Sequence, residues 1–476
     1  MKISELWHLS AKDITLGLRA GDFSCKDVTR DHLDRLERIN PMINAVTEIL
    51  EEEALATALS IDKRLAKGAD ESASLLGVPF TIKQNIDQKG TSLNDGIEVF
   101  ADRVSQEDAP VIANLRRAGA VFIGRTNCPE FSLRWDTDNT LFGPTLNPWN
   151  DQISSGGSSG GAAAAVVCGI GAVAHGNDLG GSLRYPAYCC GCCSIKPTAW
   201  KTPSFSPSYA PEEKTIAVDL MAVQGPIART VNDVRLALEA MSQSDLRDPW
   251  HLPDVRGWPH LTGPLPVAVT TEGFGAPLAP SVLEAVENAA RILENAGYSP
   301  IKTSVPSATE LADGWRSLIG VELFEMKFDR IREHGSAQIN QVVDSFLSGA
   351  PRLDIRGLLH LLQKRTKWLR EWLDFTTRYP VVIAPVSLQS PMDRSADLHS
   401  GSRFENLFTT QIPLVMVNML GLPAVSVPMG VVDDVPVGVQ IIGWRFQESL
   451  CLEVAEIIER SVGPLYEQLW AKMSTH

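Results

Sequence analysis

In the first part of the chain, apolar residues recur every three or four positions, which is the spacing of one face of a helix. Ser24 followed by Asp27 places a hydroxyl three residues before an acid, a pattern typical of the first turn of a helix. The apolar spacing continues over 51–65, and Gly68 follows as a helix stop. These features predict that residues 1–70 are helical.

The character of the chain changes after residue 75. GVPFTIK at 77–83 is a short β-rich run, and an amphipathic segment at 109–118 leads through a glycine into a second such run at 121–127. Strands that alternate with helices in this way are typical of an α/β fold.

The same alternation returns in the second half of the chain. A helix is predicted over 281–296, and residues 308–375 carry helical spacing throughout. No proline- or serine-rich linker, charge block or repeat divides the chain. We therefore predict one large α/β domain over 1–476, with a mixed β-sheet core flanked by α-helices. The further predicted strands lie at 266–271, 301–305, 380–386, 424–428 and 437–442.

Composition and charge narrow the class of function. The chain has 476 residues, 44% of them hydrophobic and 21% charged, and a formal net charge of −14. Such a chain can bury a sizeable core, and an acidic surface argues against non-specific binding to nucleic acid or to anionic membranes. The N-terminus lacks the apolar core of a signal peptide, and no apolar run is long enough to span a bilayer. The sequence thus predicts a cytoplasmic protein.

Four of the eight cysteines crowd into the run YCCGCC at 188–193, which suggests a metal site. Zinc sites need two spaced pairs of ligands, and the sequence offers no second pair of cysteines or histidines at such spacing. Small apolar side chains packed in a reducing compartment are the favoured interpretation.

Two familiar motifs can be set aside. The segment GGSSGG at 156–161 contains a GxSxG match, but the residues before it are polar and do not form the buried strand of a nucleophile elbow. Gly169 and Gly171 follow a predicted helix rather than a strand, so a dinucleotide-binding loop is not indicated.

Three segments together carry a stronger signal. Lys83 ends the apolar run GVPFTIK, where desolvation would lower the pKa of its amine toward neutral pH. GGSSGG supplies serines in a flexible loop, and DLGGSLRYPA at 178–187 places Ser182 directly after two glycines. Such glycines allow backbone N–H groups to line up beside a nucleophile, as an oxyanion hole requires.

These segments resemble the signature of the amidase signature family, serine amidohydrolases that use a Ser-cisSer-Lys triad. The 24-residue separation of Ser158 and Ser182 agrees with that family. The resemblance extends to TNCPEF at 126–131, FGPTLNPW at 142–149 and the segment NMLGLPAVSVPMG near the C-terminus. It covers most of the chain and implies a signature core over 75–230, with 308–375 as a helical insertion.

The resemblance implies a role for each residue of the triad. Ser182 would be the nucleophile that forms an acyl-enzyme, and Ser158, in a cis peptide with Gly157, would bridge it to Lys83, the neutral base. The reaction would need no metal or cofactor, because the substrate carbonyl would be polarised by backbone N–H groups alone. The oxyanion hole would be formed by Leu179, Gly180, Gly181 and Ser182.

Other residues near these motifs have plainer interpretations. Asp178 and Arg184 are expected to hold the loop, and His175, on a short apolar strand, is expected to be a hydrogen-bonded core residue rather than a base. Gln84 stands where the family commonly has Asp, which would remove a negative charge near Lys83 and favour the neutral amine. Phe131, Trp135 and Trp315 are candidates for the walls of the substrate pocket, although each would serve equally well as core.

The predicted function is hydrolysis of the C–N bond of a small-molecule carboxamide. One alternative is the glutaminase A subunit of a tRNA-dependent amidotransferase, although residues 196–198 run into AWKTPSFSPS rather than into that subunit's GxVSR-type segment. A second alternative is a catalytically inactive interaction protein. The expected partner is a small-molecule amide, with no nucleic acid and no membrane, and the sequence allows a homodimer.

Overall fold

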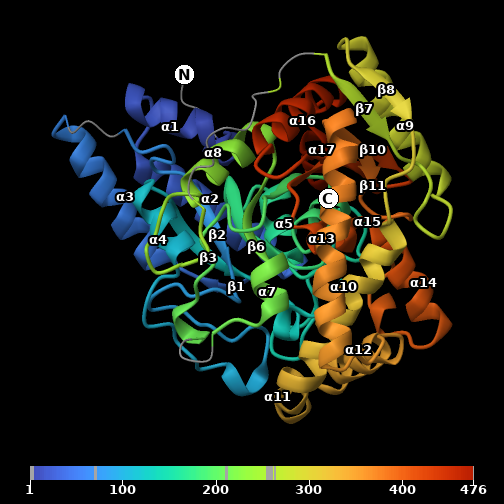
Figure 1. Ribbon diagram of the computed structural model, residues 1–476. Helices are drawn as coiled ribbons and strands as arrows, with labels where there is room; N and C mark the ends of the chain where they lie inside the picture. Colours follow the sequence, from blue (N-terminus) through green and yellow to red (C-terminus); the bar gives the residue numbers. More distant parts are fainter. Residues whose placement is uncertain (1–4, 69–71, 210–212, 253–260, 262–263, 475–476) are drawn as a thin grey trace.

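The computed structural model describes residues 5–68, 72–209, 213–252, 261 and 264–474. Within them, eleven strands join in one mixed sheet in the order β1-β3-β2-β4-β6-β5-β10-β11-β9-β7-β8 (Figure 1). β2 pairs in parallel with β3 and β4, whereas β10 pairs antiparallel with β5 and β11. The strands are β1 Val46–Ile49, β2 Pro79–Lys83, β3 Val121–Thr126, β4 Val173–Asp178, β5 Cys193–Lys196, β6 Val223–Ala228, β7 Pro266–Val269, β8 Ser299–Lys302, β9 Val381–Pro385, β10 Ala424–Val432 and β11 Val435–Ile442.

The sheet separates two hydrophobic cores. Successive side chains of a strand point to opposite faces, and in β9 Val381 and Ile383 join one core while Val382 and Ala384 join the other. β9 is buried along its whole length, as expected for a strand covered on both faces. The mixed sheet with helices on both faces confirms the predicted fold class.

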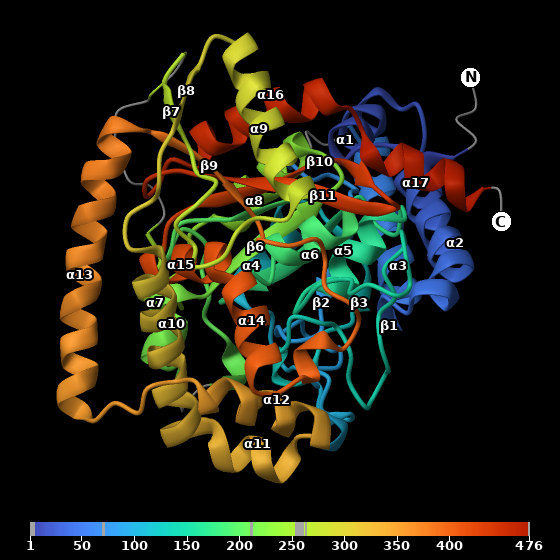
Figure 2. The same cartoon turned by 90° about the vertical axis from the view of Figure 1, so that its right-hand side faces the viewer.

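Helices from distant parts of the sequence cover the two faces. α10 packs against α13 and α15, and in Figure 2 α13 runs along one edge of the molecule while α11 and α12 lie at its lower end. The helices are α1 Ala11–Ala20, α2 Cys25–Ile43, α3 Glu51–Ala66, α4 Pro110–Arg117, α5 Gly160–Val167, α6 Arg184–Cys190, α7 Ile216–Met221, α8 Val231–Met241, α9 Pro280–Asn295, α10 Ala308–Glu322, α11 Phe328–His334, α12 Ala337–Ser348, α13 Ile355–Arg378, α14 Ser402–Thr410, α15 Ile412–Leu420, α16 Glu448–Val462 and α17 Leu465–Met473.

The N-terminal part contains predicted helices, but it also contains a strand that was not predicted. The capping box of Ser24 and Asp27 is present at the start of α2. The prediction that 1–70 is all helical is wrong for Val46–Ile49, which form the edge strand β1 against β3. Four residues are too few for period-two spacing to stand out from the flanking helices.

The helical region 308–375 contains α10 to α13, with a π-helical turn at Leu323–Lys327. β8 lies at Ser299–Lys302, two residues before the predicted start of that strand. The subdivision into a part over 1–70, a core over 75–230 and an insertion stays a prediction. Of the helices formed by the described residues, none has both the length and the apolar character needed to cross a membrane.

Candidate active site

Two parallel strands end next to each other beneath the glycine-rich segments. β2 pairs with β4 through Phe80 and Val173, so their carboxyl ends meet at one edge of the sheet. Lys83 is the last residue of β2, and Asp178 is the last of β4. α5 begins at Gly160, directly after the serine-rich loop, and packs on both strands. The topology therefore brings the three segments singled out in the sequence together, at the edge where α/β folds commonly bind ligands.

Lys83 is completely buried, and its amine makes two short contacts. Nζ lies 2.7 Å from Ser158 Oγ and donates to Asn177 Oδ1 at 2.8 Å. Burial lowers the pKa of the Lys83 amine to about 8, and nearby Asp95 and Asp178 oppose that shift. The lowered pKa expected from the sequence is thus present, and about a tenth of the amine is neutral at pH 7.

A chain of amide and hydroxyl groups extends from Lys83 to a carboxylate. Asn177 and Asn85 exchange hydrogen bonds, with Asn177 Nδ2 donating to Asn85 Oδ1 at 2.9 Å. Asn85 Nδ2 donates to Ser132 Oγ at 2.9 Å, and Ser132 donates to Asp95 Oδ1 at 2.8 Å. Sequence reasoning missed Asn85, Ser132, Asn177 and Asp95. Asn85 lies two residues after Lys83, Asn177 lies beside Asp178, and Ser132 directly follows TNCPEF, whereas Asp95 lies next to no motif.

Gln84 does not leave the lysine without a neighbouring negative charge. Its side chain donates to Ser92 Oγ at 2.5 Å and accepts from Arg125 Nε at 3.4 Å. Asp95 supplies a carboxylate near Lys83 instead, and burial raises the pKa of that carboxyl group to about 6. The side chain at position 84 contacts Ser92 and Arg125 rather than the amine of Lys83, so the expected effect of Gln84 on that amine stays a prediction.

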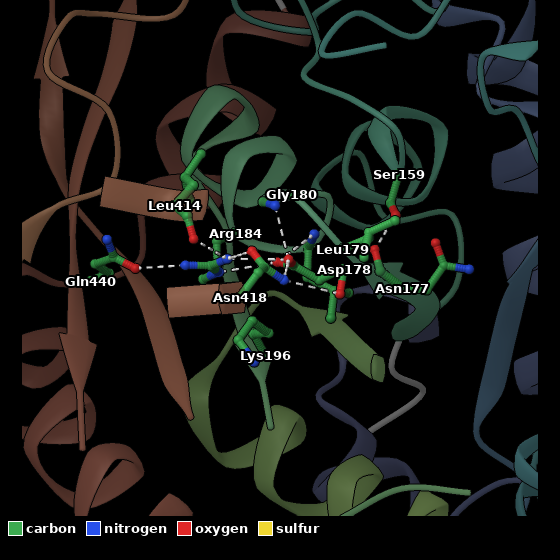
Figure 3. Close-up of polar contacts among 12 residues, drawn as sticks. Ser159, Asn177, Asp178, Leu179, Gly180, Arg184, Lys196, Leu414, Asn418 and Gln440 are labelled. Atoms are coloured by element: carbon green, nitrogen blue, oxygen red, sulfur yellow. Dashed lines mark hydrogen bonds and ion pairs between the residues drawn. The ribbon is translucent and has the colours of Figure 1, made fainter. Parts of the chain in front are cut away.

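Ser158 is almost fully buried and faces the amine of Lys83 from the loop before α5. Its peptide bond with Gly157 is cis, as the resemblance implies. A Cβ atom on Gly157 would lie 2.4 Å from the carbonyl oxygen of Arg134, so only glycine fits there. The neighbouring Ser159 points elsewhere and donates to the carbonyl of Asn177 at 3.4 Å (Figure 3).

A buried ion pair shapes the loop after β4 (Figure 3). Arg184 Nε lies 3.0 Å from Asp178 Oδ2, and both side chains are fully buried. Burial alone would raise the pKa of the Asp178 carboxyl group, but Arg184 brings it down to about 2. This agrees with the prediction that the two residues hold the loop. Arg184 also donates to Gln440, Leu414 and Asn418, so α15 and β11 are tied to the same point.

The backbone amides of the loop are not equivalent. The N–H of Gly181 donates to Asp178 Oδ1 at 2.8 Å, so this amide already has an acceptor. Within the described part of the chain, no group accepts a hydrogen bond from the N–H of Leu179, Gly180 or Ser182. The four-amide oxyanion hole stays a prediction, and three of its members are the better placed.

Ser182 lies where two cavities meet. The larger cavity, of about 270 Å³, is bordered by both Ser158 and Ser182. The described residues show no hydrogen bond between these two serines, so the structure brings Lys83 and Ser158 into contact and places Ser182 on the same cavity wall. The apolar residues along this cavity are Ile86, Leu93, Ile97, Phe100, Phe131, Leu133, Leu179, Phe205, Val218, Ala222, Ile319, Leu323 and Ile331.

A smaller cavity of about 80 Å³ adjoins Ser182 on another side, with Trp135 and Trp315 in its wall. Both indoles bond to the loop: Trp315 Nε1 donates to the carbonyl of Leu179 at 2.9 Å, and Trp135 Nε1 donates to that of Gly180 at 3.0 Å. All three aromatic residues proposed from the sequence thus border a cavity beside Ser182. Their part in binding substrate stays a prediction.

His175 and the clustered cysteines serve the core. His175 is buried, its Nε2 lies 2.9 Å from Gln224 Oε1, and burial lowers the pKa of the imidazole to about 3. Cys189 and Cys190 end α6, while Cys193 begins β5. All are buried, and burial raises the pKa of each thiol well above its ordinary value. These positions fit the packing interpretation.

Comparison with known proteins places this geometry in context. The model of the Amidase family matches residues 27–452. The indoleacetamide hydrolase of Bradyrhizobium diazoefficiens is 40% identical over 469 residues, which cover 98% of this chain and 89% of that relative. The A subunit of the glutamyl-tRNA(Gln) amidotransferase of Carboxydothermus hydrogenoformans is 30% identical over 495 residues, covering 96% of this chain and 98% of the relative.

A solved structure shows the same fold. A bacterial aryl acylamidase of the amidase signature enzymes superposes with a TM-score of 0.83 at 25% sequence identity. The match covers 97% of this chain and 98% of that one. The similarity therefore includes both faces of the sheet and the helices of 308–375.

The buried pair of Asp178 and Arg184 yields a prediction about stability. In Asp178→Asn, a buried guanidinium loses its counter-charge, and we expect the free energy of unfolding to fall by about 3–5 kcal/mol. The matched control is Glu51→Gln, which removes the exposed pair with Arg30 and should cost less than about 1 kcal/mol. Urea unfolding followed by tryptophan fluorescence measures both. Equal losses in the two variants would contradict the role of the buried pair.

Proposed function

The chain belongs to the amidase signature family and hydrolyses carbon–nitrogen bonds of small-molecule amides, and from this premise we propose that Lys83, Ser158 and Ser182 carry out the reaction. The observation that supports these roles most is the buried amine of Lys83, 2.7 Å from Ser158 Oγ. Ser158 in turn borders the same cavity as Ser182. A base, a bridging hydroxyl and a nucleophile thus follow one another into the space open to substrate.

The proposed reaction begins with a proton relay. The neutral Lys83 amine donates an N–H to Asn177 Oδ1, which leaves its lone pair free to accept the hydroxyl proton of Ser158. Ser158 then accepts the proton of Ser182 as the Ser182 oxygen attacks the substrate carbonyl carbon. The carbonyl oxygen becomes negatively charged in the tetrahedral intermediate, where N–H groups of the loop stabilise it.

The relay returns its proton when the intermediate collapses. The C–N bond breaks, and the leaving nitrogen takes the proton from Ser158, which is resupplied by Lys83. This step leaves an ester between Ser182 and the acyl group. Water then gives a proton to the same relay as it attacks the ester, which releases a carboxylate and restores Ser182. One amide and one water molecule are consumed in each cycle.

We further propose arylacetamides, such as indole-3-acetamide, as the class of substrate. The support comes from the name of the relative that is 40% identical over 98% of this chain. The aromatic lining of the larger cavity suits such a molecule, since Phe100, Phe131 and Phe205 border it together with the proposed catalytic serines. An aromatic ring packed on these side chains would place a carboxamide within reach of Ser182.

The alternative functions have less support. The amidotransferase relative is 30% identical, compared with 40% for the indoleacetamide hydrolase. In addition, residues 204–206 and 208, which belong to the segment that departs from the amidotransferase pattern, border the larger cavity. Because the chain is an enzyme, an inactive interaction protein is set aside. The homodimer that the sequence allows stays a prediction.

The triad predicts a graded loss of activity. Ser182→Ala should abolish hydrolysis of phenylacetamide and labelling by a fluorophosphonate probe, because both need the nucleophilic oxygen. Lys83→Ala should lose at least as much activity as Ser158→Ala, since removal of the base stops the relay while water can replace a bridging hydroxyl. Ammonia release and gel-based labelling measure these effects. Wild-type turnover in Ser182→Ala would contradict the assignment of Ser182 as the nucleophile.

Asp95 gives a prediction about pH. Its carboxylate favours the charged form of Lys83, so Asp95→Asn should lower the pKa of the amine. The neutral base then persists to lower pH, and the acidic limb of the kcat/KM profile should move to lower pH than in the wild type. Glu98→Gln, an exposed carboxylate on the same segment, is the control and should leave the limb in place. An acidic limb that keeps its position in Asp95→Asn, or that moves to higher pH, would contradict the electrostatic role of the Asp95 carboxylate.

The substrate class can be tested with a panel of amides. Indole-3-acetamide and phenylacetamide should be hydrolysed more efficiently than propionamide or glutamine, because only the aryl compounds bury a ring in the cavity. Phe131→Ala should raise KM for the aryl amides about tenfold and change kcat/KM for propionamide little. Phe324→Ala, an exposed phenylalanine, is the matched control. Preferred turnover of glutamine would favour the amidotransferase alternative instead.

A further inference from the structure

The loop between β4 and α6 contains two peptide units whose orientation decides where its N–H groups point. A trans peptide is planar, so the carbonyl of one residue and the N–H of the next point in opposite directions. A hydrogen bond that holds the carbonyl of Leu179 therefore also sets the direction of the Gly180 N–H. The carbonyl of Gly180 stands in the same relation to the N–H of Gly181.

The unit between Gly180 and Gly181 is held at both ends. Trp135 Nε1 donates to the carbonyl of Gly180 at 3.0 Å, and the N–H of Gly181 donates to Asp178 Oδ1 at 2.8 Å. Gly181 has φ +104, and a Cβ atom there would lie 2.6 Å from Leu414. This unit is locked in place, and its N–H already has an acceptor.

The unit between Leu179 and Gly180 is held at one end only. Trp315 Nε1 donates to the carbonyl of Leu179 at 2.9 Å. At the other end, the N–H of Gly180 meets no acceptor among the described residues. The indole of Trp315 lies directly against this glycine, since a Cβ atom on Gly180 would be 2.7 Å from the ring. Trp315, Gly180 and Ser182 border the same small cavity.

Trp315 is itself firmly placed. It belongs to α10, and only 6% of the residue is exposed. Its ring meets that of Phe346 of α12 edge-on, with 5.8 Å between the ring centroids, and it stacks on the ring of Phe408 of α14, with 6.3 Å between the centroids. Aromatic contacts on two sides restrict rotation of the indole, so its N–H holds a constant direction toward Leu179.

We infer that Trp315 is a positioning residue for catalysis: it aims the N–H of Gly180 at the substrate oxygen on which negative charge develops, while Trp135 secures the neighbouring peptide unit. The inference rests on the proposed role of Ser182 and goes beyond it, because it gives the helical region 308–375 a part in transition-state stabilisation. A preorganised donor stabilises the developing charge without a reorganisation cost, and without Trp315 Nε1 the Leu179–Gly180 peptide can turn away.

The inference differs measurably from a role as a pocket wall. A wall that binds substrate affects KM, whereas a donor that acts in the transition state affects kcat. Loss of one oxyanion donor lowers kcat about 100- to 1000-fold, so loss of the group that aims it should cost about 10- to 100-fold. KM for phenylacetamide should stay within about twofold of the wild-type value.

The experiment compares Trp315→Phe with Trp372→Phe. Trp372 is likewise buried, on the neighbouring helix α13, but its Nε1 donates to the carbonyl of Pro306, which does not border either cavity. We expect kcat to fall in Trp315→Phe at unchanged KM, and to change less than threefold in Trp372→Phe. Equal falls in kcat in both variants, or a rise in KM at unchanged kcat in Trp315→Phe, would overturn the inference.

A second replacement separates the hydrogen bond from the shape of the ring. β-(3-Benzothienyl)alanine at position 315 keeps the bicyclic shape and replaces the ring N–H by a sulfur atom, which cannot donate a hydrogen bond. The same loss of kcat is expected, together with a matching loss of affinity for phenylacetaldehyde, whose adduct with Ser182 carries the oxyanion. Wild-type kcat in this variant would overturn the inference alone, whereas wild-type activity in Ser182→Ala, measured alongside, would overturn the proposed function itself.

Discussion

The burial of one lysine amine is the constraint on which the site depends. Lys83 is fully buried at the carboxyl end of β2, where its amine contacts Ser158 and Asn177. Desolvation lowers the pKa of its amine to about 8, while Asp95 and Asp178 keep it from falling further. The balance gives a base that is available near neutral pH and can still be reprotonated in each catalytic cycle.

The rest of the structure supports the loop between β4 and α6. The ion pair of Asp178 with Arg184 fixes the loop from within, and contacts of Arg184 with α15 and β11 extend this support to the C-terminal half of the chain. Trp135, from the segment before α5, and Trp315, from α10, donate to two carbonyl groups of the same loop. A short segment that must present amides to a substrate is thus held by elements far apart in the sequence, as a preorganised site requires.

The sequence was most informative where a motif is local. The strand ending at Lys83, the two serines and the glycines before Ser182 could be located from composition and spacing, and the resemblance to a family supplied their roles. The polar chain from Asn177 to Asp95 could not be located, because it joins residues of four separate segments, and no pattern within one segment shows that they meet. The edge strand β1 was missed because four residues carry too little periodicity.

The titration of Lys83 itself tests the central claim most directly. In the enzyme labelled with ¹⁵N at the lysine side chains, the Nζ resonance of Lys83 can be assigned by its loss in Lys83→Arg and followed as the pH is raised. The account predicts a midpoint near pH 8, well below that of the exposed lysines, because burial disfavours the charged amine. A midpoint near 10.5, the ordinary value, would leave only about one amine in three thousand neutral at pH 7 instead of about one in ten, and it would contradict the assignment of this residue as the base.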